Sequence, residues 1–174
     1  MLRLLLTFVH VSAAMGVFGA AAIEGASLLE LNRAGTSPTA LGGFGLAQRA
    51  GSISFTLLLL SGIYLTQAVW GWRTAWVDVA LLGLVGMGAI DASVTRRAME
   101  RLRVTSDGGR EYNVLVWSFL TRLGILIGIV FLMTVKPPLQ PSLIAVAAGA
   151  GAGFLAGRPA RRLPSLEGAH LAKK

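Results

Sequence analysis

Four side chains that can carry charge or bind a metal lie inside long apolar stretches of the sequence. They are His10, Glu24, Asp91 and Arg122. Placing an ionised side chain in hydrocarbon costs at least about 2.5 to 3.5 kcal/mol on insertion scales, so such residues are default candidates for a functional site. They could do two kinds of chemistry: charge or proton transfer through the carboxylates and the guanidinium, and haem or metal ligation by the imidazole.

Glu24, Asp91 and Arg122 are predicted to lie at a similar depth. Each carboxylate is about one helical turn, and the arginine about two turns, from the same end of the predicted bundle. Arg122 can therefore be neutralised by Glu24, by Asp91 or by both. One interpretation is a proton or ion relay, and the other is a buried pair that fixes how three helices pack. We favour the structural interpretation, because one compact pair does not make a pathway across a membrane.

His10 is the one histidine in an apolar stretch. Imidazole is a ligand for haem iron and for copper. The second histidine, His170, belongs to the C-terminal tail on the opposite side, which excludes bis-histidine haem ligation within one chain. Haem b or copper would need His10 with Met133, or a site shared between two chains. We favour a hydrogen-bonded structural histidine and no bound cofactor. The polar neighbours expected for it are Tyr64, Gln67 and Asp78.

The composition explains why these residues stand in apolar surroundings. Of 174 residues, 54% are hydrophobic and 14% are charged, whereas about 25% of an ordinary soluble domain is charged. A soluble fold of this size could not bury so much apolar surface. There is no cysteine, which excludes disulfides, thiolate metal sites and catalytic cysteines.

Five apolar stretches each approach the roughly 20 helical residues that a bilayer core of about 30 Å requires. They cover residues 4–28, 53–69, 76–94, 114–135 and 139–157. The sequence therefore predicts an all-α transmembrane helix bundle with five spans over residues 1–157. Residues 158–174 are predicted to form a basic, disordered cytoplasmic tail, and residues 32–51 a flexible loop. The third helix is expected to run past the membrane for about two turns, as far as a break at Asp107-Gly108-Gly109.

The net charge of +8 follows from an uneven distribution of cations between the two sides of this bundle. One side carries Arg3, Arg73 and Lys136. The other carries twelve cations: Arg33, Arg49, Arg96, Arg97, Arg101, Arg103, Arg110, Arg158, Arg161, Arg162, Lys173 and Lys174. Cytoplasmic loops of membrane proteins are enriched in Lys and Arg, so the N-terminus is predicted outside the cell and the C-terminus in the cytoplasm. The sequence shows no basic face interleaved with aromatic residues, the pattern that would indicate nucleic-acid binding.

Glycines recur at four-residue spacing in the last two stretches. Gly124 and Gly128 lie in the fourth, and Gly149, Gly153 and Gly157 lie in the fifth. Small residues four apart form a flat face on which membrane helices approach closely. The favoured interpretation is packing within the chain. The alternative is a homo-oligomer, or a contact with a membrane-complex partner, through the fifth helix.

Several segments resemble a family of small bacterial polytopic integral membrane proteins, a domain of unknown function. They are TFVHVSAAMGVFG, SGIYL, GWRTAWVDVALL and GIVFLMTVKPPLQPSLIAV, and together they extend over most of the chain. The resemblance implies a bacterial cytoplasmic membrane. The helix of His10 is also loosely similar to copper-resistance D-like proteins and to the protoporphyrinogen-oxidase membrane family, which implies metal or haem binding at that histidine. This chain has no second histidine in a membrane stretch.

No phosphate loop, zinc-helix motif or nucleophile elbow is present, so the sequence leaves catalysis open and favours a non-enzymatic role. The favoured function is a scaffold or a subunit of a membrane complex, with the lipid bilayer as its first partner. A haem- or copper-binding redox component acting through His10 is one alternative. A small transporter or ion pathway using Glu24, Asp91 and Arg122 is the other.

Overall fold

A computed structural model describes residues 1–72, 74–104 and 109–157, and these residues are almost entirely helical. They form six α-helices: α1 (Leu2–Ala34), α2 (Pro38–Leu65), α3 (Ala75–Ile90), α4 (Arg96–Val104), α5 (Gly109–Val135) and α6 (Leu139–Ala156). Two single π-helical turns, η1 (Thr66–Trp70) and η2 (Asp91–Thr95), extend α2 and join α3 to α4. The predicted tail, and Asp107 and Gly108 of the predicted break, lie outside the described residues.

Five helical segments are long and apolar enough to cross a membrane. They are Leu2–Ala34, Pro38–Val69, Ala75–Val104, Gly109–Val135 and Leu139–Ala156. The predicted all-α architecture with five helices of membrane-spanning length is confirmed at this level. Large apolar side chains are exposed on all of them, among them Leu5, Ile53, Leu82, Ile127 and Leu143. So much exposed apolar surface is what a lipid environment accepts and water does not.

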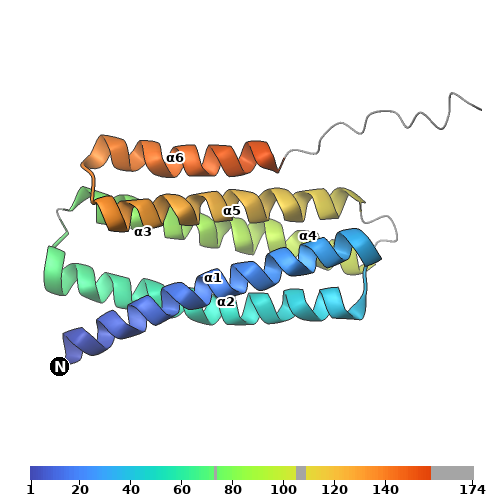
Figure 1. The fold of residues 1–174 in the computed structure, drawn as a ribbon, viewed down its shortest axis with the longest axis horizontal. Helices are drawn as coiled ribbons and strands as arrows, with labels where there is room; N and C mark the ends of the chain where they lie inside the picture. The colour runs from blue at the N-terminus through green and yellow to red at the C-terminus, as the bar shows by residue number, and fades with distance from the viewer. Residues whose placement is uncertain (73, 105–108, 158–174) are drawn as a thin grey trace, which may run out of the picture.

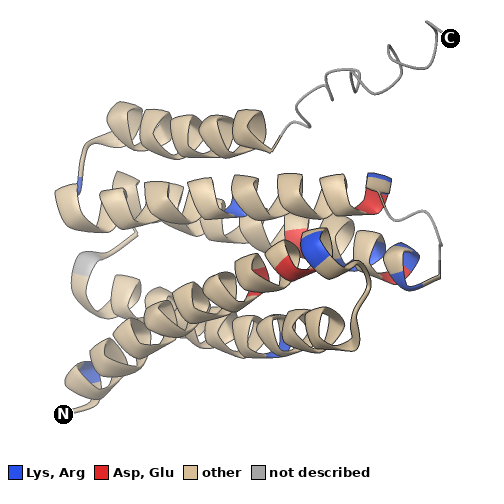
Figure 2. Cartoon of the chain, turned by 45° about the vertical axis from the view of Figure 1, so that its right-hand side comes forward, with Lys and Arg blue, Asp and Glu red and all other residues tan. Residues whose placement is uncertain are grey.

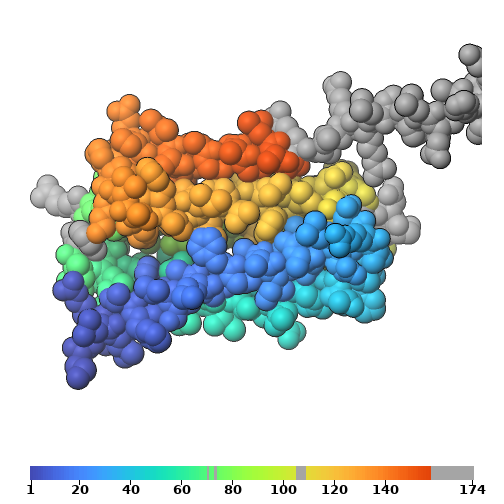
Figure 3. Space-filling model, in the orientation of Figure 1, coloured from blue at the N-terminus to red at the C-terminus, as the bar shows by residue number. Residues whose placement is uncertain are grey.

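The helices are arranged in three layers (Figure 1). The antiparallel pair α1 and α2 forms one outer layer, α3 and α5 the middle layer, and α6 the other outer layer. The closest packing is between α1 and α2, and between α5 and α6. Contacts between the α1–α2 hairpin and the other helices are sparser. In the space-filling view, α6 and the hairpin lie along opposite edges with α5 between them (Figure 3).

The predicted flexible loop over residues 32–51 is wrong. α1 continues to Ala34 and α2 already begins at Pro38, so the connection is a short turn. The turn passes through Gly35, whose φ of 68° is a conformation that favours glycine. Ser37 then caps α2 by accepting a hydrogen bond of 3.2 Å from a backbone N–H in its first turn, and proline is favoured directly after such a cap.

The glycines that suggested a loop instead allow α2 to pack closely on α1. A Cβ atom at Gly43 would lie 2.6 Å from Ser27 Oγ, and one at Gly51 would lie 3.3 Å from Ala20 Cβ. Both positions need the absence of a side chain rather than the flexibility of glycine. Arg49, expected in a loop, consequently lies within α2.

The helices long enough to span a membrane differ widely in length. At 1.5 Å per residue, the 33 residues of α1 extend about 50 Å and the 18 residues of α6 about 27 Å. A hydrocarbon core of about 30 Å matches α6 and is exceeded by α1. The excess lies where α1 meets α2, because Gly157, after α6, packs against Trp117, about two turns into α5. That end has its own buried cluster: Leu28, Leu31, Ala40, Phe44, Ala98, Met99, Leu102 and Leu115.

Candidate functional site

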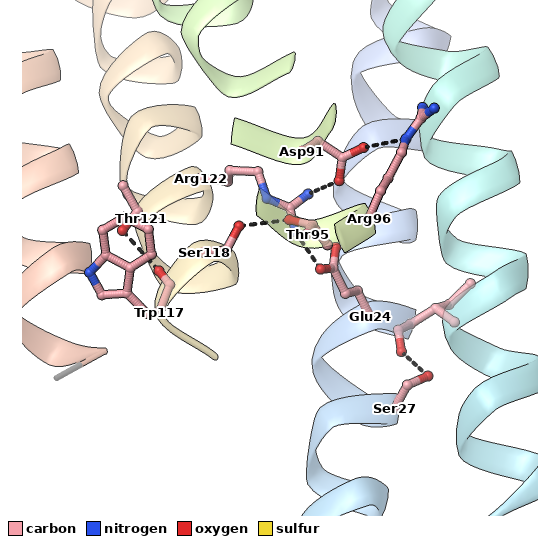
Figure 4. Close-up of polar contacts among 10 residues, drawn as sticks. Glu24, Ser27, Asp91, Thr95, Arg96, Trp117, Ser118, Thr121 and Arg122 are labelled. Atoms are coloured by element: carbon pink, nitrogen blue, oxygen red, sulfur yellow. Dashed lines mark hydrogen bonds and ion pairs between the residues drawn. The ribbon is translucent and has the colours of Figure 1, made fainter. Parts of the chain in front are cut away.

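Arg122 of α5 lies between two carboxylates that come from distant parts of the chain (Figure 4). Its Nη1 donates a hydrogen bond of 3.1 Å to Oδ1 of Asp91, and its Nη2 pairs with Oε1 of Glu24 on α1. The side chains of Arg122 and Glu24 are 14% and 9% exposed. The structure thus brings together the three charged residues singled out in the sequence, and the arginine contacts both carboxylates rather than one.

Asp91 is the first residue of the π turn η2. Its second oxygen, Oδ2, lies 3.7 Å from Nε of Arg96. The Asp91 carboxylate therefore contacts two arginines, Arg96 and Arg122. At the other end of the turn, the buried hydroxyls of Thr95 and Ser118 are 2.7 Å apart and tie η2 to α5. Isolated π turns occur frequently at functional sites. We call the four residues Glu24, Asp91, Arg96 and Arg122 the ion cluster.

A cavity of about 200 Å³ lies beside the ion cluster, and all four members line it. We call it the inner cavity. Gln48 of α2 lines it as well. Gln48 Nε2 and Arg122 Nε are buried and have no hydrogen-bond partner among the described residues. Buried polar groups are nearly always paired in native proteins, so each of these two donors calls for an acceptor that the described side chains and backbone do not supply.

The α2 side of the inner cavity could not be identified from the sequence analysis. Gln48 and Ser52 both line it, one helical turn apart, and Gln48 lies in the segment predicted as a loop. A helical signal is nevertheless present, since Ala40, Phe44 and Ala47 are buried and follow the i, i+4, i+7 spacing of one helix face. Reading that spacing as a helix would have placed Gln48 beside the apolar core.

His10 lines a second cavity, of about 220 Å³, which we call the outer cavity. Met133 lines it too, so the two side chains proposed as haem or copper ligands border one space. The expected polar neighbours do not border it. Among the described residues, its lining does not include Tyr64, Gln67 or Asp78.

The polar partner of His10 is Ser61 of α2, with Nδ1 and Oγ 3.0 Å apart. The Ser61 hydroxyl donates its proton to the carbonyl oxygen of Leu57 at 2.5 Å. A hydroxyl has one proton to donate, so when Ser61 donates it to a backbone carbonyl, its oxygen accepts from His10 and the proton of the neutral ring is on Nδ1. The other ring nitrogen, Nε2, then carries a lone pair. His10 is thus hydrogen-bonded to Ser61, and in that tautomer its Nε2 can accept a hydrogen bond or bind a metal.

An apolar layer separates the two cavities. Val17 and Leu126 line the inner cavity, Leu58 and Leu84 line the outer one, and all four belong to one buried hydrophobic cluster. The described residues therefore form no continuous polar route from His10 to the ion cluster.

The glycines of α5 and α6 face one another. A Cβ atom at Gly124 would overlap the carbonyl oxygen of Gly149, and one at Gly149 would overlap that of Gly124. A Cβ atom at Gly128 would lie 3.0 Å from the α6 backbone, one at Gly153 would overlap a carbonyl oxygen of α5, and one at Gly157 would lie 2.7 Å from the α5 backbone. The glycine face is therefore used within the chain, and a second copy would have to use another face of α6.

Neither the metal chemistry nor known proteins identify the site. Within the described ranges, no group of three or more His, Cys, Asp and Glu side chains could hold a metal ion. Comparison with protein-family models, curated proteins and solved structures finds no significant match to this chain. The ion cluster and the two cavities are therefore the features from which a function has to be inferred.

Proposed function

We propose that this chain is a multi-pass protein of a bacterial cytoplasmic membrane, with its N-terminus outside and its C-terminus in the cytoplasm. The positions of the described cations support this. Arg33 and Arg101 lie in the last turns of α1 and α4, at one end of the bundle. Arg3 and Lys136 belong to the opposite end, which carries few charges (Figure 2). By the rule that cytoplasmic ends are rich in Lys and Arg, the first end is cytoplasmic.

In this arrangement the ion cluster lies in the cytoplasmic half of the bilayer. α6 is long enough to span only the hydrocarbon, and the residue after it, Gly157, packs against Trp117. Arg122 is five residues further along α5, about 8 Å deeper. The C-terminal end of α1 and the part of α5 that precedes Trp117 then project into the cytoplasm. The buried cluster around Leu31 and Leu115 lies in this projecting part.

Single cysteines will test this topology, since the chain has none of its own. Thr36→Cys, in the exposed α1–α2 turn, is expected to react with a membrane-impermeant maleimide only after the cells are opened. Gln140→Cys, exposed at the start of α6, is expected to react in intact spheroplasts. The reverse pattern would contradict the orientation. Labelling of both sites in intact spheroplasts would contradict the three spans expected between them.

We infer that the chain acts without catalysis, as a scaffold or subunit of a membrane complex. The observation that carries this is the mutual neutralisation of the membrane charges: Arg122 pairs with Glu24 and Asp91 and so links α1, η2 and α5. Charges engaged in this way hold helices together. The exposed apolar side of α6, with Leu143 and Leu155, is the face we assign to a partner or a second copy.

Extraction from the native membrane will test this role. In a mild detergent the chain is expected to migrate on a native gel well above the size of one 18.2 kDa chain with its micelle, and a harsher detergent should reduce it to that size. Substituting Leu143→Lys on α6 should also lower the size, whereas Leu82→Lys, at an even more exposed position on α3, should not. Migration as a lone chain in the mild detergent would refute the proposal.

A small transporter or ion pathway is a second candidate, favoured by the inner cavity beside the ion cluster. Purified protein in liposomes would then dissipate a proton or cation gradient faster than protein-free liposomes do, and Glu24→Gln would slow this while leaving the protein folded. If the chain is only a scaffold, we expect no such flux, because an apolar layer separates the inner cavity from the outer cavity.

A further inference from the structure

We propose that the inner cavity binds the ring of a membrane quinone, a flat and electrically neutral head group with two carbonyl oxygens. This goes beyond the scaffold role, because it assigns a ligand to a site that the helix contacts alone do not need. Three features carry the proposal: the hydrogen-bonding groups left unpaired, the shape and chemistry of the walls, and the side from which the cavity opens.

The unpaired groups select a hydrogen-bond acceptor. Gln48 Nε2 and Arg122 Nε are both N–H donors, and neither has a partner among the described residues. A carbonyl oxygen is an acceptor without a proton, so it can satisfy such a donor directly. Since an unpaired buried donor has lost its hydration without gaining a partner, a ligand that supplies acceptors is favoured over a purely apolar one.

The charges around the cavity select a neutral ligand. The ion cluster has two carboxylates and two guanidinium groups, so its formal charge is zero. Both oxygens of Asp91 are engaged with arginines, and Arg122 is engaged with Glu24 as well. An anion would face Glu24 and Asp91 at close range, and a cation would face the two arginines. Either would disturb pairs that are already matched.

The walls favour a flat ring. Phe55 of α2 and Phe119 of α5 both line the cavity. Each packs against a glycine, since a Cβ atom at Gly88 would lie 3.2 Å from Phe55 Cζ and one at Gly25 would lie 3.1 Å from Phe119 Cζ. Aromatic side chains stack on flat π systems better than on acyl chains. The volume of about 200 Å³ is below the 300–1,000 Å³ typical of sites that enclose a whole ligand. It suits a head group whose tail stays outside.

The opening of the cavity lies toward the lipid. Its walls come from α1, α2, α3, η2, α4 and α5. The backbones of α2 and α3 are not closely packed, and it is the side chain of Phe55 on α2 that reaches Gly88 on α3. Ser52 on α2 and Arg96 at the start of α4 line the cavity and are exposed at its rim. A ligand dissolved in the cytoplasmic half of the bilayer can therefore enter sideways and leave an isoprenoid tail among the lipids.

Calorimetric titration of decylubiquinone into the full-length protein in nanodiscs of quinone-free phosphatidylcholine will test the proposal. Saturable binding of one quinone per chain is expected, above the signal of empty nanodiscs. Gln48→Leu removes one donor at nearly constant volume and should weaken binding about tenfold, the effect of one buried hydrogen bond. Ser52→Phe places a ring at the exposed rim and should abolish binding.

Two matched variants control for general damage. Gln140→Leu makes the same change at an exposed site on α6, and Thr56→Phe makes the same change one turn further along α2, outside the cavity lining. Both should bind like the unaltered protein. The proposal is overturned if decylubiquinone gives no saturable signal, if Gln48→Leu binds as tightly as the parent, or if oleate or dioleoylglycerol displaces the quinone at equal concentration. The last result would assign the cavity to an acyl lipid.

Discussion

Arg122→Met is expected to lower the free energy of unfolding by about 3 to 5 kcal/mol, because removing one partner of a buried ion pair leaves its counter-charges unpaired. Here Glu24, at 9% side-chain exposure, would be left without a cation, and Asp91, at 28%, would keep only its contact with Arg96. Met fills most of the space of the lost side chain, so the effect reports charge rather than a cavity. The measurement is unfolding of the purified protein by sodium dodecyl sulfate in mixed micelles, followed by far-ultraviolet circular dichroism.

A neutral version of the cluster will show whether the loss is electrostatic. The triple variant Glu24→Gln, Asp91→Asn and Arg122→Met removes both charges left by the single change. It should recover most of the lost stability, since replacing a whole buried ion pair by neutral groups is often close to neutral. Arg49→Met, on the exposed side of α2, is the matched control and should change stability by less than about 0.5 kcal/mol.

The two variants also separate the roles discussed for the cluster. If the triple variant is as unstable as Arg122→Met, the loss comes from packing and the ion cluster does not hold the helices together by charge. If the triple variant folds and is assembled with its partner as before, the charges serve stability alone. A folded triple variant that no longer enters the complex would mean that the partner recognises the cluster itself.

The ion cluster could be predicted from the sequence because the membrane leaves charged residues few options. Glu24, Asp91 and Arg122 each interrupt an apolar stretch, and helix geometry gives their depths with no further information. A guanidinium at the same depth as two carboxylates is expected to pair with them, because an unpaired charge in apolar surroundings is costly. The second salt bridge of Asp91, to Arg96, needed the π turn η2, which shifts the following residues around the helix axis. Such turns depend on tertiary packing and have no simple sequence signal.

The sequence does not reveal the start of α2, because glycine is common both in loops and in close helix contacts. In a water-soluble segment, the Gly, Ser and Thr of residues 32–51 would indicate a loop. In a membrane bundle the same small residues make a face for a close helix contact. Gly43 against Ser27 and Gly51 against Ala20 follow the second rule. Because Gln48 lies between them, the error in the helix boundary also hid the inner cavity.

The glycines of the last two helices lead to a prediction that compares two neighbouring positions. Gly149→Ala is expected to destabilise the protein by about 1 to 3 kcal/mol, the cost of overpacking a closed contact. Its new methyl group would overlap the carbonyl oxygen of Gly124, a backbone atom that no side-chain rotation can move aside. Gly151→Ala makes the same change two residues away, where a Cβ atom would meet nothing within 4 Å.

Gly151→Ala should therefore leave stability unchanged or raise it by about 0.5 to 1 kcal/mol, because alanine is the better residue inside a helix. The opposite signs of the two changes in the same unfolding assay are the expected result. Equal effects would mean that α6 is not held at the distance at which Gly149 meets Gly124. α6 would then be packed by its larger side chains, and its glycine face would be open to a second chain. The close contact instead reserves that face for α5, and assembly must use the side of α6 that carries Leu143 and Leu155.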